Sequence, residues 1–350
     1  MISLLIAAGV SLMVSLVGTR YLIDWLTSHK VGQPIQEDGP QGHVTKAGTP
    51  TMGGVAFVVA ALVGYLAGHV RSGLVFTRTG LIVMATIVAA GIVGALDDWI
   101  KVSRERNLGL SSRAKMLGLL IVAVGFVVAT LTLTDIHTTI SFTRFDSPGI
   151  DIPGWVWAVW AMLLLAGTTN AVNLTDGLDG LAAGSSIFAF ICFVVVGFWA
   201  FRHPEVYRVE HALDLAVVAA AMLGGVTGFL WWNANPARIF MGDTGSLAIG
   251  AALACLALTT NTQLLLPVIG FLFVLETVSV MLQVTRFRLT GKRFFRMAPI
   301  HHHFELGGWP ETTVIIRFWI LAGAATALGL GLFYADFLAN TTGGARVVPS

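Results

Sequence analysis

The stretch that decides the fold is ALDLAVVAAAMLGGVTGFLWW, residues 212–232, which is followed directly by NANPARIFMGD, residues 233–243. The first part is almost wholly apolar and long enough to cross the ~30 Å hydrocarbon core of a bilayer as one helix. The second part contains amides, an arginine, a proline and a carboxylate. The stretch therefore predicts a membrane helix that ends in a polar site.

The same alternation of apolar runs and polar clusters extends over the whole chain. Hydrophobic residues make up 55% of the 350 residues and charged residues only 11%, whereas a soluble domain carries about 25% charged residues. We therefore predict an all-α, polytopic membrane protein, with residues 1–350 forming a single transmembrane domain. The ten predicted spans are residues 2–25, 52–70, 80–97, 116–134, 154–170, 178–201, 212–232, 246–260, 264–285 and 313–338.

Composition also argues against nucleic acid as a partner, against a disulfide and against a cleaved signal peptide. No basic tract indicates nucleic acid, and Cys192 and Cys255 lie inside apolar runs, where they are expected to pack as small core residues. The first span lacks the positively charged start and the cleavage site of a signal peptide, so we expect it to be retained.

Four polar clusters each follow an odd-numbered predicted span: Asp97-Asp98, Asn173–Asp179, Asn233–Asp243 and His301–His303. If every span crosses the membrane once, all four clusters emerge on one side. Thirteen lysine and arginine residues lie in the loops after odd-numbered spans, against six in the other loops and the C-terminal tail. Because positive residues concentrate in cytoplasmic loops, we expect an active site at the cytoplasmic face, with the N- and C-termini outside.

Two segments carry additional local signals. Alternating residues around Thr139–Phe145 predict a small external β-hairpin near residues 139–152. The ninth span contains Pro267 and Gly270, which can kink a membrane helix. It also contains Glu276, a charge that is expected to face the bundle; the sequence assigns it no role.

A transporter is the alternative from a different functional class. Many secondary transporters carry internal repeats and bind substrate near the bilayer midplane. We find no such repeat here, and few charged residues lie within the predicted spans. Polar residues gathered at span ends favour an enzyme that works at the membrane surface.

Two adjacent carboxylates close the third predicted span. Asp97 and Asp98 at a helix C-terminus oppose the helix macrodipole. One explanation is that they pair with Lys101, at i+4 and i+3, and mark the membrane surface. One carboxylate would suffice for that pairing, whereas two suit metal binding or proton handling.

The second and third clusters are dense enough to bind a ligand. Residues 170–180 hold two amides, a hydroxyl, two carboxylates and two glycines, more than a helix-capping turn needs. Amides offer donors and acceptors to a nucleobase or sugar. Asp243 could act only as the N-cap of the eighth span, but a carboxylate at a helix N-terminus can also hold Mg²⁺ beside substrate phosphates.

Three consecutive histidines form the fourth cluster. Histidines suggest zinc, but adjacent residues rarely converge on one tetrahedral ion, and no cysteine cluster supports such a site. We therefore expect His301–His303 to contact phosphate or sugar. The basic residues between Arg286 and Arg296 are expected to contact lipid headgroups.

Five motifs together resemble those of the phospho-N-acetylmuramoyl-pentapeptide-transferase family, within the polyprenyl-phosphate N-acetylhexosamine-1-phosphate transferase superfamily. They are KAGTPTMGG (46–54), DDWIK (97–101), NLTDGLDG (173–180), FMGDTGS (240–246) and PIHHHFE (299–305). The resemblance runs from the first span to the tenth, without a departure at these positions. The last motif distinguishes this family from relatives that use UDP-N-acetylglucosamine, which remain the alternative.

The resemblance implies a reaction and its partners. Phospho-N-acetylmuramoyl-pentapeptide would pass from UDP-N-acetylmuramoyl-pentapeptide to undecaprenyl phosphate, releasing UMP and forming the first lipid intermediate of peptidoglycan. Mg²⁺ is the implied cofactor, and the bacterial plasma (inner) membrane is the implied location. The oligomeric state stays open, with a homodimer as one candidate.

The resemblance also implies roles for individual residues. Asp243 is similar to the metal ligand, Phe240 to the residue that stacks on uracil, and Asp97 and Asp98 to the catalytic carboxylate pair; Asp243 and His301 are included in the catalytic group. Nucleoside-side contacts are implied for Asn173, Asp176, Asp179 and Asn233. Phosphate or sugar contacts are implied for Lys46, Lys115, His301, His302 and His303.

Two chemical routes remain open at this stage. The lipid phosphate, with a second pKa near 6, can attack directly, with Asp97 or Asp98 orienting or deprotonating it. The same carboxylate can instead act as a nucleophile and form an aspartyl-phosphate.

Overall fold

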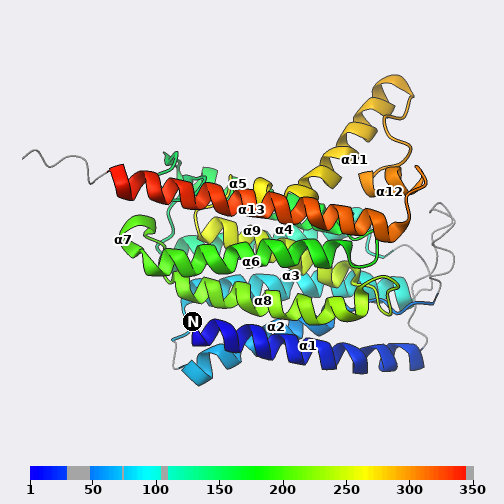
Figure 1. The fold of residues 1–350 in the computed structure, drawn as a ribbon, viewed down its shortest axis with the longest axis horizontal. Coiled ribbons are helices and arrows are strands. Elements are labelled where there is room, and N and C mark those ends of the chain that lie inside the picture. Colours follow the sequence, from blue (N-terminus) through cyan, green and yellow to red (C-terminus); the bar gives the residue numbers. More distant parts are fainter. Residues whose placement is uncertain (30–47, 73–74, 104–108, 344–350) are drawn as a thin grey trace, which may run out of the picture.

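A computed structural model of the chain describes residues 1–29, 48–72, 75–103 and 109–343. Long helices lie side by side along one axis (Figure 1). Eight of the described helices are long and apolar enough to cross a membrane: α1 (Ile2–Ser28), α3 (Arg78–Ser103), α4 (Ser112–Leu133), α5 (Gly154–Thr175), α6 (Leu181–Arg202), α8 (Ala212–Asn233), α9 (Gly242–Thr259) and α13 (Glu311–Gly343). The predicted all-α, multi-pass class is confirmed. Helices suit a bilayer because they satisfy their backbone hydrogen bonds internally.

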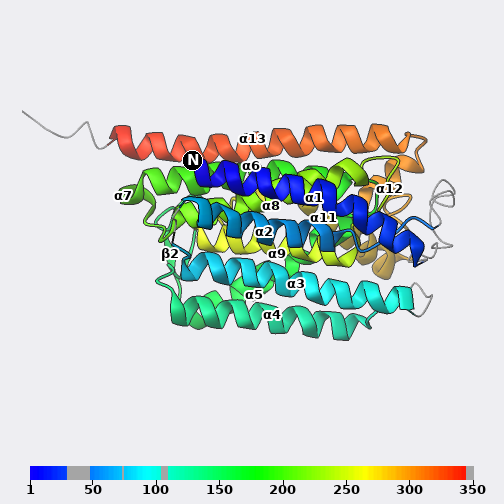
Figure 2. The ribbon, with the colours of Figure 1, turned by 90° about the horizontal axis from the view of Figure 1, so that it is seen from below.

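The remaining helices are shorter or less apolar. They are α2 (Gly54–Ser72), α7 (Pro204–Tyr207), α10 (Leu266–Ile269), α11 (Phe271–Thr290) and α12 (Ile300–Glu305). The apolar part of α2 coincides with the second predicted span. The N-terminal end of α1 and the C-terminal end of α13 lie at the same end of the bundle (Figures 1 and 2).

The ninth predicted span, in which Pro267 and Gly270 were expected to permit a kink, is interrupted. The chain forms the short helix α10, breaks at Gly270 and restarts as α11. Pro267 lies in the first turn of α10, where a helix does not need its N–H. Beyond Met281, α11 leaves the bundle, and almost all of its residues are exposed (Figure 1).

The predicted small hairpin near residues 139–152 is confirmed. Strands β1 (Thr139–Ile140) and β2 (Ile150–Asp151) pair antiparallel, with Thr139 opposite Asp151. Nε of Arg144, between the strands, lies 3.0 Å from Oδ2 of Asp336 and ties the hairpin to α13.

Helix α9 is the centre of the bundle and is buried along almost its whole length (Figure 2). It packs against α2, α3, α5, α6 and α8. Glycines permit these close approaches: a Cβ at Gly94 of α3 would overlap the backbone of Asp243, and one at Gly250 would overlap that of Thr169 in α5. The N-terminal part of α9 is therefore held closely against α3 and α5.

Candidate active site

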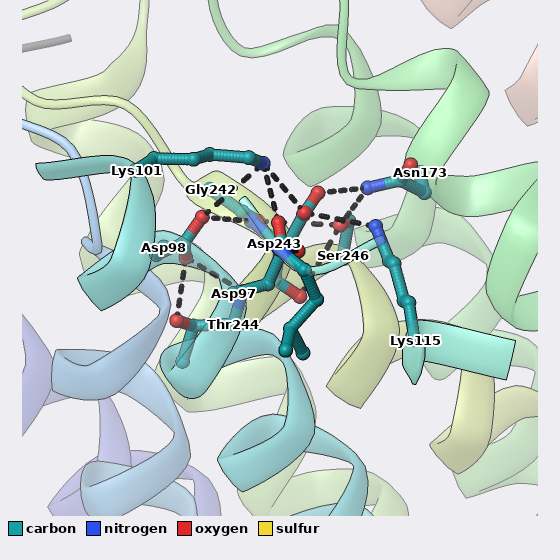
Figure 3. A network of polar contacts seen from close by, with 10 residues as sticks. Asp97, Asp98, Lys101, Lys115, Asn173, Gly242, Asp243, Thr244 and Ser246 are labelled. Carbon is teal, nitrogen blue, oxygen red and sulfur yellow. Dashed lines mark hydrogen bonds and ion pairs between the residues drawn. The ribbon is translucent and has the colours of Figure 1, made fainter. Parts of the chain in front are cut away.

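Three carboxylates meet where α3 ends and α9 begins (Figure 3). Oxygens of Asp97, Asp98 and Asp243 lie within 4.8 Å of one another, and all three residues are buried. Helix α3 continues to Ser103, beyond the predicted end of the third span, so both of its aspartates lie in the last turns of a regular helix. Asp243 lies in the first turn of α9.

Asp98 caps the N-terminus of α9. Its carboxylate accepts hydrogen bonds from the backbone N–H groups of Asp243 (3.0 Å) and Thr244 (2.9 Å) and from the Thr244 hydroxyl (2.7 Å). The unfavourable position of Asp98 at the end of α3 is thus offset by the positive end of α9. Asp243 makes no capping hydrogen bond with its own side chain, so the capping alternative for Asp243 is wrong.

Two lysines and an amide surround the Asp243 carboxylate. Nζ of Lys101 lies 2.7 Å from Asp243 Oδ2 and 2.6 Å from Asp97 Oδ2, and Nζ of Lys115 lies 2.8 Å from Asp243 Oδ2. Asn173 donates to Asp243 Oδ1 and also to Ser246 Oγ. The pairing of Asp97 with Lys101 is confirmed, but it belongs to a buried network rather than to a simple membrane-surface mark.

Sequence reasoning did not include Lys101 or Ser246 among the site residues. The i+4 spacing of Lys101 from Asp97 indicated that these two residues pair. It could not indicate that Lys101 also pairs with Asp243 of α9. Ser246 follows Asp243 by three residues, a spacing that places both on one face of a helix. That spacing was the available signal for Ser246.

The donor atoms of this cluster fit a hard divalent cation. Mg²⁺ is typically bound by one or two carboxylates together with water and substrate phosphate oxygens. The oxygens of Asp98 are already occupied by α9, whereas Oδ2 of Asp243 faces two ammonium groups and its Oδ1 accepts from Asn173. Asp243 is therefore the carboxylate best placed to hold a cation, and Lys101 and Lys115 would then be released towards phosphate.

Asp179 and Asn233, both expected to contact nucleoside, also shape the loop before α9. Asp179 Oδ2 accepts hydrogen bonds from Asn235 Nδ2 (3.2 Å) and from the Ala237 N–H (3.0 Å). Asn233 donates to the Ile239 carbonyl (2.9 Å). These bonds fix the loop that carries Phe240.

Phe240 is half-buried and is held through its backbone. Its N–H donates to the Pro50 carbonyl, and its carbonyl accepts from the Gly53 N–H. The KAGTPTMGG motif therefore contacts the FMGDTGS motif directly. Lys46 itself lies outside the described residues.

Asp176 follows α5 and lies near the same carboxylates. Burial raises its pKa to about 8, with further contributions from the negative charges of Asp243, Asp98 and Asp179. The unliganded protein thus favours a protonated Asp176 at neutral pH. Such a shift is typical of groups at functional sites.

We expect Asp176→Asn to stabilise the unliganded protein. The folded protein favours the protonated form of Asp176. The resulting contribution to the free energy of unfolding is fully present below the ordinary pKa of about 3.9, and it is lost as the pH rises towards 8. Asparagine has no charge to lose, so its advantage should grow from about pH 4 to pH 8 and then level off. Because Asp176 is partly exposed, we predict the sign and the pH window, to be checked by thermal unfolding from pH 5 to 9. A constant difference across this range would contradict the prediction.

The three histidines have different surroundings. His301 is fully buried, with Nδ1 3.1 Å from Glu276 Oε2 and Nε2 against Gly177. His302 Nδ1 lies 2.7 Å from Glu305 Oε2, and His303 Nδ1 accepts from the Arg296 N–H (3.1 Å). With the Asp97–Asp243 and Asp179–Asn235 contacts, all four polar clusters therefore meet at one end of the bundle.

Comparisons with known proteins find family models and relatives that match this chain. A family model described as glycosyl transferase family 4 matches residues 80–261, and one described as phospho-N-acetylmuramoyl-pentapeptide-transferase signature 1 matches residues 46–58. Relatives named phospho-N-acetylmuramoyl-pentapeptide-transferase are 52% identical in Frankia alni, 51% in Thermobifida fusca and 48% in Cutibacterium acnes. Each alignment covers 97% of this chain and 99% of the relative.

The fold and the site together define a multi-pass membrane transferase with an acidic cluster at one end of its helices. Within that class, the chain belongs to the phospho-N-acetylmuramoyl-pentapeptide-transferase family. The resemblance drawn from the five motifs is confirmed.

Proposed function

We propose that this chain transfers phospho-N-acetylmuramoyl-pentapeptide from its UDP-linked form to undecaprenyl phosphate and releases UMP. The observation that carries the proposal is the convergence of Asp97, Asp98 and Asp243 with two lysines at the ends of apolar helices. One substrate is water-soluble and anionic, and the other is held in lipid with its phosphate at the surface. A site at the end of a membrane bundle lets the two phosphates meet.

Direct attack is the simpler route at this site. An oxygen of the lipid phosphate forms a bond to the sugar-linked phosphorus, the bond between that phosphorus and the bridging oxygen breaks, and UMP leaves with that oxygen. Such a transfer depends mainly on positioning and charge neutralisation. Lys101 and Lys115 can neutralise phosphate oxygens, and Mg²⁺ held by Asp243 would supply further Lewis-acid neutralisation.

The surroundings of the two α3 aspartates favour Asp97 as the residue that acts on the lipid phosphate. Asp98 is engaged by three donors of α9. Asp97 accepts one backbone N–H, from Leu110 (2.7 Å), and pairs with the ammonium group of Lys101. Asp97 can orient or deprotonate the attacking phosphate, and in the covalent alternative it would be the nucleophile.

Product analysis tests the proposed function directly. The purified protein is incubated with UDP-N-acetylmuramoyl-pentapeptide, undecaprenyl phosphate and Mg²⁺, and both UMP and a lipid-linked muramoyl pyrophosphate should appear. A parallel reaction with UDP-N-acetylglucosamine should give neither product. Product formation from UDP-N-acetylglucosamine and not from the muramoyl substrate would show that the chain transfers phospho-N-acetylglucosamine instead.

We place the site at the cytoplasmic face of the bacterial inner membrane, with ten crossings and both termini outside. The charge distribution between loops supports this orientation. Single cysteines at Ser103 and Gly307, near the site, should resist an impermeant thiol reagent in intact cells, whereas one at Glu205 should react; all three positions are exposed. The natural cysteines are buried. Labelling in the reverse pattern would overturn the orientation.

Phe240 is proposed to stack on the uracil ring. Stacking of an aromatic side chain on a base contributes ~1–3 kcal/mol, so Phe240→Ala should raise the KM for the UDP substrate by about 5-fold to 150-fold. Phe240→Trp should retain most of the binding. Steady-state kinetics of the two variants separates stacking on uracil from packing of the loop. Equal KM values for Phe240→Ala and wild type would show that the ring only packs.

A further inference from the structure

A buried pair lies beside the aspartate cluster without being part of it. Glu276 of α11 and His301 of α12 are both 0% exposed, and Glu276 Oε2 lies 3.1 Å from His301 Nδ1. In the described part of the chain, neither oxygen of Glu276 makes a hydrogen bond to any other group. A buried carboxylate is costly unless a partner compensates it. His301 is therefore the partner that compensates the burial of the Glu276 carboxylate.

The opposite side of the His301 ring faces the site loop between α5 and α6. Nε2 packs against Gly177, where a Cβ would overlap the ring. Gly177 directly follows Asp176, whose pKa is raised by burial and by the nearby charges of Asp243 and Asp98. Among the described residues, Nε2 has no hydrogen-bond partner. Buried polar atoms without partners are rare and call for an explanation.

We propose that Glu276 is a positioning residue that acts through His301. Its carboxylate holds the proton on Nδ1 and fixes the ring so that Nε2 is presented to the loop Asp176–Asp179 and to the donor bound there. A carboxylate beside one ring nitrogen selects the tautomer in this way. The inference rests on the proposed function, because the ligand concerned is the uridine diphosphate-linked donor.

A second buried pair provides a matched control. His69 Nε2 lies 3.0 Å from Asp214 Oδ1, and both side chains are almost fully buried. Asp214 also accepts hydrogen bonds from Tyr65 and Thr77. Asp214 and Asn233 lie near opposite ends of α8, about 28 Å apart at 1.5 Å per residue. Asp214→Asn therefore perturbs a similar pair far from the site.

The test uses the full chain and UDP as the probe. Dissociation constants for UDP are measured by calorimetry for wild type, Glu276→Gln, His301→Asn and the double variant, alongside thermal unfolding and KM for both substrates. Glu276→Gln should weaken UDP binding and raise the donor KM by about 10-fold to 100-fold, the range seen where a carboxylate orients a metal-binding histidine. The KM for the lipid phosphate should not change. The double variant should bind UDP no more weakly than His301→Asn alone, because Glu276 acts through that ring.

Several results would overturn the proposal. Wild-type UDP affinity in folded Glu276→Gln, or additive losses in the double variant, would show that Glu276 does not act through His301. A loss of thermal stability without a change in binding would assign it a structural role only, as we expect for Asp214→Asn. If Glu276→Gln does not fold, Gly177→Ala displaces the ring from the other side. It should weaken UDP binding in wild type and much less in His301→Asn, and equal losses would reject the proposal.

The same experiment separates this inference from the proposed function. A wild-type protein that binds UDP but forms no lipid-linked product would refute the proposed transfer reaction. Wild-type turnover together with unchanged constants in Glu276→Gln would instead refute only the positioning role.

Discussion

Asp243→Asn is expected to lower turnover by about 10²–10³-fold, the loss typical when one electrostatic contact to a reacting group is removed. The substitution removes the charge that faces Lys101 and Lys115 and that would hold Mg²⁺. The shape of the side chain is kept. The concentration of Mg²⁺ needed for half-maximal turnover should therefore rise as well, and kinetics over a Mg²⁺ series measures both effects.

Stability should change little in the same variant. The N-terminus of α9 is capped by Asp98 and not by Asp243, so the helix start does not depend on the altered carboxylate. Lys101 also keeps Asp97 as a partner. Thermal unfolding serves as the control for folding. Near-normal activity of a folded Asp243→Asn protein at limiting Mg²⁺ would rule out the metal role.

Asp97→Asn and Asp98→Asn should fail for different reasons. In Asp98→Asn an amide group replaces one oxygen that receives N–H donors of α9, and a buried donor left without its acceptor costs ~1–3 kcal/mol. This variant should unfold at a lower temperature. Asp97→Asn keeps an oxygen for the Leu110 N–H and should keep its stability while turnover falls by about 10²–10⁴-fold.

The pH dependence of Asp97→Asn then separates two mechanisms. A general base is dispensable once the lipid phosphate ionises unaided, above its second pKa near 6. Partial recovery of turnover between pH 6 and pH 9 would assign Asp97 to proton transfer. Equal inactivity across this range would favour positioning or a covalent aspartyl-phosphate. An unstable Asp97→Asn beside a stable Asp98→Asn would reverse the assignment of roles made from the structure.

Helix positions followed from local properties of the sequence. An apolar run long enough to span a bilayer has to form a helix, because its backbone groups find no other partners in lipid. Nine of the ten predicted spans therefore coincide with a helix. The ninth is divided between two helices, because a proline and a glycine within an apolar run permit either a kink or a break, and packing decides between them. Helix α11 then leaves the bundle (Figure 1).

Residue types at the site were also evident from the sequence, but their partners were not. The motifs identified Asp97, Asp98 and Asp243 as a functional set, and the fold brings them together. That Asp98 caps α9 could not be predicted, since it and Thr244 are 146 residues apart. From the sequence, Lys101 was expected to pair only with the aspartates of its own helix, and Glu276 had no assigned role.

The sequence by itself thus determined the class, the approximate helices and the polar clusters, because hydrophobic length and residue chemistry are local quantities. Tertiary structure alone decided which carboxylate caps a helix, which faces two lysines and which holds a histidine. These roles depend on distances between residues of different helices. Close packing around small residues such as Gly94 and Gly177 sets those distances, and no pattern within a single helix records them.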